Sequence, residues 1–235
     1  MSAIESTRIV NNLIECLSRK EGKRILQHCE SVDLIFGAIL CEAHQPFVHV
    51  YFPLTAFVSL MTTVSGHPPL EMGLIGNEGM LGATLALGVN TAPLHAVVQG
   101  PGKALRMTAL QLRRDMHESS TLRSVFSRYL YVLMAQLAQT AACVHFHEIE
   151  ARLARWLLMT HDRAHADHFF LTHKYLAEML GVQRSAVTIA AGTLQRQTLI
   201  EYSRGEIRIV DRSGLEAVSC ECYAAVVDDY ARVFG

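Results

Sequence analysis

The spacing of the apolar residues changes near Thr108, and this change constrains the fold more than any other feature of the sequence. Before it, short runs rich in β-branched and aromatic residues alternate with turn residues, as antiparallel strands do. The runs are 47–52, 56–64, 69–76, 95–99 and 102–107. After it, apolar residues recur at helical spacing. The sequence therefore predicts an α+β chain in which an N-terminal, jelly-roll-like antiparallel β-roll precedes a helical part.

Composition limits the class of protein. Half of the 235 residues are hydrophobic, which is enough for two cores. The longest apolar stretch, 129–144, is interrupted by Gln136 and Gln139, so no bilayer-spanning helix is expected. The first twelve residues lack the pattern of a secretory signal. We expect a soluble cytoplasmic protein that does not bind membranes, and its net charge of −1 argues against bulk basicity as its means of binding nucleic acid.

The cysteines are scattered, and none belongs to a Cys-x-x-Cys pair. They are Cys16, Cys29, Cys41, Cys143, Cys220 and Cys222. Cys220 and Cys222 are the only close pair. A zinc ribbon or a disulfide scaffold is not expected from this spacing, and the thiols are interpreted as small buried hydrophobes. The sequence thus predicts no metal site.

A long helix, from about residue 120 to residue 147, follows the β-rich part. Six of its positions are spaced 4, 3, 4, 3 and 4 residues apart, as a coiled-coil seam requires. They are Phe126, Leu130, Leu133, Leu137, Thr140 and Val144. The spacing predicts a homodimer that pairs through this helix. The alternative is a helix that packs only on its own β-roll.

A second amphipathic helix begins at Glu148, and a polar loop, 165–169, follows it. We place a domain boundary between the two helices. The prediction is an effector-type β-roll domain with the dimerisation helix, 1–147, and a C-terminal domain, 148–235.

The C-terminal domain contains the pattern of a helix-turn-helix. Thr172 is a good N-cap for residues 173–180, and Gly181 ends that helix in a tight turn. A second helix is predicted from Gln183 to about Arg196. Two strands, 199–202 and 206–210, then form a hairpin, which completes a winged helix-turn-helix. The alternative is a structural helical hairpin with a solvated polar face.

The polar residues of this segment are of the types that contact DNA bases and phosphates. Side chains at the start of the second helix suit base edges in the major groove. They are Gln183, Arg184, Ser185 and Thr188. Thr172, His173 and Lys174 begin the first helix, where backbone N–H groups and positive charge can hold phosphate. Arg204 lies at the tip of the wing and is a further candidate phosphate ligand. The predicted partner is double-stranded DNA.

Four fragments resemble the Crp/Fnr family of bacterial regulators, and together they extend over nearly the whole chain. They are 50–61, 73–82, 150–158 and 171–200. The resemblance implies a transcription regulator that binds a pseudo-palindromic site as a dimer and contacts RNA polymerase. Arg184 falls on the family's base-contacting arginine. Ser185 stands where an acidic residue often follows, and Ile189 stands at a later basic position, which leaves the target sequence open.

The cyclic-AMP-binding members of that family use a Gly-Glu pair and an Arg-Ser pair to hold the ribose and the phosphate. Here Ala83 follows Gly82, the stretch 91–94 lacks the arginine, and Leu137-Ala138 replaces the adenine-facing Thr-Ser pair. The predicted effector is therefore not cyclic AMP, or is absent altogether, and the cofactor is unknown.

Twelve histidines raise the question of a metal or haem. His145 and His147 point about 200° apart on a helix and cannot share an ion. His161, His165 and His168 lie in the expected polar loop region. The alternative function is a haem or small-molecule sensor that acts through protein contacts. No arrangement of a nucleophile with a base is present, so an enzyme is not predicted.

Overall fold

The computed structural model describes residues 10–235 and begins with two short helices and a β-roll. The elements are α1 (Asn12–Glu15), α2 (Arg19–His28), β1 (Glu30–Leu34), β2 (Ile39–Cys41), β3 (His49–Pro53), β4 (Phe57–Thr62), β5 (Leu70–Ile75), the 3-10 helix η1 (Ala83–Leu87), β6 (His95–Gly100) and β7 (Gly102–Thr108). The expectation about a secretory signal concerns residues that lie mostly outside this described range. Within it, no helix is both long and apolar enough to cross a membrane.

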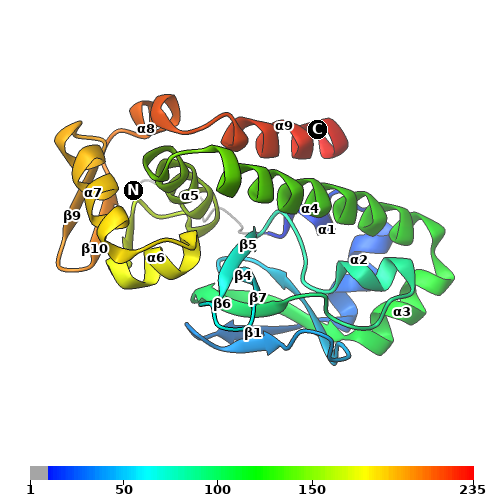
Figure 1. The fold of residues 1–235 in the computed structure, drawn as a ribbon. Helices are drawn as coiled ribbons and strands as arrows, with labels where there is room; N and C mark the ends of the chain where they lie inside the picture. Colours follow the sequence, from blue (N-terminus) through cyan, green and yellow to red (C-terminus); the bar gives the residue numbers. More distant parts are fainter. Residues whose placement is uncertain (1–9) are drawn as a thin grey trace, which may run out of the picture.

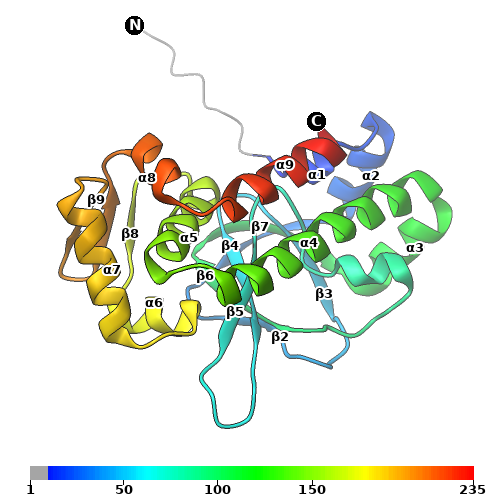
Figure 2. The ribbon, with the colours of Figure 1, turned by 45° about the horizontal axis from the view of Figure 1, so that its top comes forward.

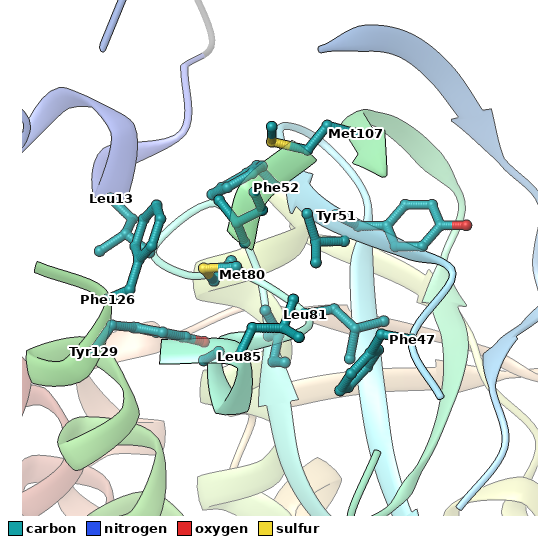
Figure 3. Packing of buried hydrophobic residues seen from close by; sticks show 14 of the residues in the cluster. Leu13, Phe47, Tyr51, Phe52, Met80, Leu81, Leu85, Met107, Phe126 and Tyr129 are labelled. Atoms are coloured by element: carbon teal, nitrogen blue, oxygen red, sulfur yellow. The ribbon is translucent and has the colours of Figure 1, made fainter. Parts of the chain in front are cut away.

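The roll consists of two antiparallel sheets, ordered β1-β7-β3 and β2-β6-β4-β5 (Figure 1). Val58 pairs with Ile75 in the β4–β5 hairpin, whose turn includes residues 65–67. Apolar side chains from both sheets, from η1 and from α4 (Ser120–Phe146) fill one core (Figure 3). This confirms the predicted α+β class and the antiparallel roll.

The remaining chain is mainly helical, with one small sheet. Its elements are α3 (Ala109–Glu118), α4, α5 (Ile149–Ala164), β8 (His168–Phe170), α6 (His173–Leu180), α7 (Arg184–Arg196), β9 (Ile200–Ser203), β10 (Glu206–Ile209), α8 (Arg212–Val218) and α9 (Cys222–Phe234). The proposed domain boundary falls between α4 and α5. Helix α9, which the sequence analysis did not anticipate, lies alongside α4 (Figures 1 and 2).

The segment 165–169 is not wholly a loop, which corrects the prediction for it. Its last residues belong to β8, which pairs with β10 in a sheet ordered β8-β10-β9. A strand of three residues is too short to show the alternation of polar and apolar side chains from which strands are predicted. Its pairing with a strand about 40 residues later supplies the hydrogen bonds that stabilise it.

Four of the six predicted seam residues, Phe126, Leu130, Leu133 and Thr140, are buried within the protomer, which leaves them no surface for a partner, and Leu137 and Val144 are half-buried. Phe126, Leu130 and Leu133 are buried in the roll core. Leu137 packs against Gly73 of β5, and Thr140 accepts a hydrogen bond from Arg155 in α5. These side chains have partners within the protomer, as the alternative interpretation of the helix required. A different face of α4 is exposed.

The exposed face of α4 follows the predicted seam with a shift of one residue. Its members are Ser127, which is half-buried, and the exposed residues Tyr131, Met134, Ala138, Ala141 and His145. A shift of one residue rotates a helical position by about 100°. Tyr131 and Met134 are each 59% exposed. We call these six residues the outer stripe; its spacing is still that of a coiled coil.

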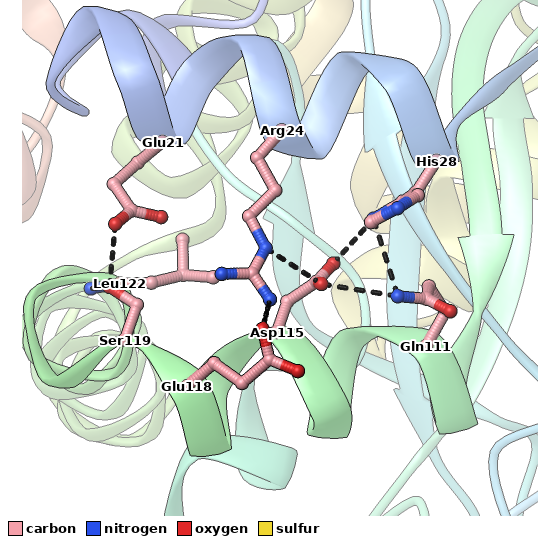
Figure 4. A network of polar contacts seen from close by, with 8 residues as sticks. All are labelled: Glu21, Arg24, His28, Gln111, Asp115, Glu118, Ser119 and Leu122. Atoms are coloured by element: carbon pink, nitrogen blue, oxygen red, sulfur yellow. Dashed lines mark hydrogen bonds and ion pairs between the residues drawn. The ribbon is translucent and has the colours of Figure 1, made fainter.

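A buried carboxylate joins the N-terminal helices to α3 (Figure 4). Asp115, which is fully buried, accepts hydrogen bonds from Arg24 Nε at 3.0 Å and from Gln111 Nε2 at 3.1 Å, and it pairs with His28 Nδ1 at 2.9 Å. Glu21 accepts a hydrogen bond from Ser119, the N-cap of α4. A buried charge is tolerated only when it is paired in this way, so the network fixes α2 against α3 and α4.

Polar contacts also join the roll to α5. Glu71 of β5 accepts hydrogen bonds from Trp156 Nε1 at 2.8 Å and from Ser59 Oγ at 2.6 Å. Arg163 forms an ion pair with Glu78 at 2.7 Å. These contacts set the position of α5, and with it the helix-turn-helix that α5 supports, relative to the roll.

The buried carboxyl group of Glu71 is expected to make the stability of the folded chain depend on pH. Burial raises the pKa of Glu71 to about 7, although Ser59, Trp156 and the charges of Arg163 and Arg155 act to lower it. The folded state therefore binds this proton more tightly than the unfolded state. The resulting stability is complete at low pH and is lost as the pH rises from 4.5 to about 7. The loss expected from one such group is about 3 kcal/mol.

Glu71→Gln tests this expectation, because the amide has the same shape but does not titrate in this range. Urea unfolding of the wild type and of the variant at several pH values between 5 and 8 gives the comparison. We expect the variant to lose less stability than the wild type across this range. Parallel curves for the two proteins would show that Glu71 has an ordinary pKa.

Candidate nucleic-acid interface

Helices α6 and α7 are joined by a tight turn at Gly181. Thr172 Oγ1 caps α6 by accepting a hydrogen bond from the backbone of Tyr175 at 3.2 Å. Gly181 has φ +64°, and a Cβ there would lie 2.7 Å from Leu70 of β5. The left-handed φ favours glycine, whereas the contact is with the end of a flexible leucine side chain. Helix α7 then starts at Arg184, and its inner face (Val187, Ala190, Ala191 and Leu194) is buried.

The outer face of α7 presents the residues that the sequence analysis assigned to base reading. Gln183, Arg184, Ser185 and Thr188 are all exposed. No carboxylate lies within ion-pair distance of Arg184 in the part of the chain that the structure describes. Ile189, which is 69% exposed, lies on the same face and was not assigned a role. The first two turns of α7 thus present a free guanidinium beside amide and hydroxyl groups.

His173 differs from its neighbours Thr172 and Lys174, which are exposed. Its ring stacks on Tyr202 with a centroid distance of 4.3 Å. Thr188 Oγ1 donates to the carbonyl of Arg184, so His173 Nδ1–H donates to Thr188 Oγ1 at 2.9 Å. Burial and the charge of Arg184 lower the pKa of His173. A neutral, stacked ring is suited to holding α6, α7 and β9 together, and only its backbone N–H is available to a phosphate.

The wing places an exposed arginine at the far end of the domain. Strands β9 and β10 pair from Ile200 with Ile209 to Ser203 with Glu206. The two turn residues, Arg204 and Gly205, have φ values of +51° and +88°. Such a turn matches the twist of the flanking strands. Arg204 is exposed at this tip, and Arg208 behind it pairs with Glu201 at 3.7 Å.

The predicted DNA-binding residues therefore fall into two groups. One lies where α6 and α7 begin, with Lys174, Gln183 and Arg184 beside a cavity of about 730 Å³ that the β4–β5 hairpin closes from the roll side. The other is the wing tip with Arg204. The hairpin residue Val64, 63% exposed, borders the same cavity. The β4–β5 hairpin of the roll and the start of α7 thus line one cavity.

The segment 79–94 of the roll contains no residue suited to a cyclic phosphate. Residues 79–94, which include η1, contain no charged side chain. Gly82 has φ +104°, and a Cβ there would meet Val50 at 2.5 Å, so this turn is packed closely onto β3. Met80, Leu81 and Leu85 fill the space with apolar groups. A buried phosphate would need a paired cation, and this segment offers none.

The structure brings together one group that could hold a metal, and the sequence analysis missed it. Cys143 and His147 at the end of α4 meet Cys220 and Cys222 at the start of α9, with all four ligand atoms within 4.8 Å of one another. A Cys-x-Cys pair and a Cys–His pair four residues apart on a helix were the available signals. Of the histidines in 161–168, His161 pairs with Asp167 at 2.8 Å.

Comparison with known families and structures agrees with this architecture. Residues 151–218 match the model of the Crp-like helix-turn-helix domain. The match starts in α5 and ends with α8, so α9 lies beyond it. No curated protein matches the sequence.

Three solved structures share the fold. A putative Crp/Fnr-family transcriptional regulator of Eubacterium rectale is 15% identical with a TM-score of 0.68, covering 88% of this chain and 96% of its own. The c-di-GMP-responsive global regulator CLP of Xanthomonas campestris is 14% identical with a TM-score of 0.65, covering 82% and 99%. FixK2 of Bradyrhizobium japonicum is 16% identical with a TM-score of 0.63, covering 82% and 98%. At these identities the likeness is one of fold.

Proposed function

We propose that this chain, which is of the Crp/Fnr type by its fold and by its Crp-like helix-turn-helix domain, is a transcription regulator. It binds a specific, pseudo-palindromic DNA site as a homodimer. The effector is not cyclic AMP, and the proposal includes no catalytic activity. RNA polymerase is the second macromolecular partner that we propose, because a regulator bound near a promoter acts on transcription through it.

The observation that carries the proposal is the free face at the start of α7. Arg184 has no acidic partner among the described residues, and Gln183 and Ser185 beside it are exposed. An arginine at such a place can donate two hydrogen bonds to one guanine in the major groove, and glutamine can do the same to adenine. Lys174 at the start of α6 and Arg204 at the wing tip are exposed and suit the phosphates that flank the groove.

The outer stripe of α4 supports the homodimer. Tyr131, Met134 and Ala138 continue a coiled-coil spacing on the side of α4 that the protomer leaves uncovered. A symmetric pair of α4 helices would bury this stripe and would present two copies of α7 to one duplex. Two such copies read half-sites about 34 Å apart when they bind successive major grooves on one side.

Selection of bound fragments from genomic DNA with the purified protein tests the proposal. We expect one recovered motif with two inverted half-sites, whose centres are about 10 base pairs apart. Binding to that duplex should weaken steeply as salt increases, because phosphate contacts release counterions. Recovery of random fragments, or of none, would contradict the proposed function.

Arg184→Ala should reduce discrimination at one base pair in each half-site. The expected loss is about 1 to 3 kcal/mol, or roughly 5- to 150-fold, because the lost contact is specific to one base. Binding to the selected site and to single-base variants of it, measured by fluorescence anisotropy, gives this value.

Arg204→Asn is the matched control, since asparagine tolerates the left-handed turn conformation of residue 204. It should weaken binding to all duplexes by a similar factor and reduce the salt dependence by about one counterion. If Arg184→Ala also weakens binding to every duplex equally, then Arg184 contacts phosphate and reads no base.

A further inference from the structure

We infer that the chain binds one zinc-class divalent metal ion through Cys143, His147, Cys220 and Cys222, which we call the clamp site. The site joins the end of α4 to the start of α9. It lies outside the DNA-reading surface and stands independently of the proposed function.

The distances in the clamp site are those of a tetrahedral donor set. Cys143 Sγ lies 3.5 Å from Cys220 Sγ, and Cys222 Sγ lies 3.4 Å from His147 Nδ1. All four donor atoms are within 4.8 Å of one another. Zinc–sulfur bonds of about 2.3 Å in a tetrahedron imply sulfur–sulfur distances of about 3.8 Å. An ion at the centre requires only a small adjustment of the side chains.

The local structure explains how four separate residues meet. Cys143 and His147 are four residues apart, so they share one side of the last turn of α4. The backbone N–H of His147 donates to the carbonyl of Cys143 at 3.1 Å, which closes that turn. Cys220 and Cys222 flank Glu221, the N-cap of α9. All three cysteines are buried, which protects the sulfur atoms from solvent.

The histidine of the clamp site has a partner that orients it. His147 Nε2 lies 3.2 Å from Glu221 Oε1, so Nε2–H donates to that carboxylate. The lone pair of Nδ1 then points to the sulfur atoms. A carboxylate that holds the far nitrogen of a metal-binding histidine is the usual supporting contact at zinc sites. Glu221 contributes this contact although it is itself exposed.

The charges next to the clamp site suit thiolates. Three thiolates and one divalent cation carry a net charge of −1, which must be balanced in a buried place. Arg152 and Arg155 of α5 are buried and line a cavity of about 30 Å³ together with Cys143. The Nε of Arg155 has no hydrogen-bond partner among the described residues. The guanidinium groups of Arg152 and Arg155 therefore supply positive charge that can balance the thiolates. Neutral thiols would provide no such balance.

The position of the clamp site in the fold determines what a bound ion would do. Residues 148–219 form the helix-turn-helix unit, and the site lies at both of its ends, because His147 precedes it and Cys220 follows it. An ion there would hold the two ends together and attach α9 to α4. Binding deprotonates the three thiols and releases the protons to solvent, so the ion stabilises the folded chain and the attachment of the unit to α4.

Metal analysis of the full-length protein, purified under reducing conditions without chelator, is the first test. We expect about one zinc ion per chain by mass spectrometry. After the zinc is removed, Co²⁺ alone should bind and produce the visible absorption of tetrahedral thiolate coordination. The melting temperature should fall on zinc removal and recover when Zn²⁺ is restored.

Substitutions of the cysteines and of Glu221 test where the ion binds. Cys220→Ser and Cys222→Ser should each lose the zinc, whereas Cys16→Ser, at an exposed cysteine far along the chain, should retain it. Glu221→Gln changes an exposed side chain and so leaves the fold intact. It should weaken Zn²⁺ affinity by about 10-fold or more, and Glu15→Gln, also exposed, should not.

Two metal-binding results would overturn the inference, and so would one persistent disulfide. One is a reduced protein that contains no zinc and binds neither Zn²⁺ nor Co²⁺. The other is retention of the ion by both Cys220→Ser and Cys222→Ser, which would place it elsewhere. A disulfide between Cys143 and Cys220 that persists in the reduced preparation would also exclude the site, because it consumes two of the four donors. None of these measurements uses DNA, so failure of the DNA-binding proposal leaves them unaffected.

Discussion

Phe126→Ala is expected to lower the free energy of unfolding by about 3 to 5 kcal/mol and to leave the dimer dissociation constant unchanged. The ring of Phe126 is fully buried and lies 5.9 Å from the ring of Phe52 in the roll core (Figure 3). Its removal leaves a cavity between α4 and β3 that the roll cannot close. Urea unfolding measures the loss, and analytical ultracentrifugation of the folded variant measures the oligomeric state.

Phe170→Ala is the matched control, because this phenylalanine is 75% exposed. Its removal should cost less than about 1 kcal/mol. A Phe126→Ala protein that keeps its stability but dissociates into monomers would show that Phe126 faces a partner, as the heptad spacing alone suggested. The experiment therefore separates the two faces of α4.

Ala138→Glu is expected to raise the dimer dissociation constant about 100-fold, because like charges placed together across an interface cost several kcal/mol. Ala138 is exposed at the middle of the outer stripe, where a two-fold axis would bring both copies close together. The change touches no residue of the roll core, so the stability of the protomer should stay within about 0.5 kcal/mol of the wild type. Sedimentation equilibrium at several concentrations gives the constant.

Ala224→Glu on α9 is the control for Ala138→Glu, since it adds the same charge to another exposed alanine of a helix. We expect it to leave the dimer intact. The monomeric Ala138→Glu protein should bind a single half-site with much lower affinity than the dimer binds the full site, since the linked second contact is lost. Unchanged dimerisation of Ala138→Glu would assign the interface to another surface.

Local patterns were sufficient for much of the fold. Short runs rich in β-branched and aromatic residues, separated by turn residues, located β3 to β7, and the Thr172 cap with Gly181 located both helices of the helix-turn-helix. These features depend on residues a few positions apart, so their physical causes are visible in the sequence. Helix α9 was missed because its stability comes from packing on α4 and no cap or turn pattern announces it. Strand β8 depends on its pairing with β10 in the same way.

The candidate site could be predicted where the exposure of a side chain follows from its position on a helix relative to the apolar residues. The face of α7 with Gln183, Arg184 and Thr188 follows from the apolar positions opposite it. The inward stacking of His173 on Tyr202 did not follow, because it needs the distance between α6 and β9. The clamp site also required tertiary structure, since Cys143 and Cys220 are 77 residues apart.

By itself, the sequence determined strands β3 to β7, helices α4 to α7, the wing hairpin and the exposed face of α7, because each depends on residue type, hydrophobic period, capping and turn chemistry within a few residues. Tertiary structure alone decided which side of α4 meets the roll, and it placed the outer stripe one residue away from the predicted seam. Both faces of α4 have coiled-coil spacing, and periodicity cannot say what packs against each. That choice depends on the surface of the roll, which exists only once strands distant in sequence have paired.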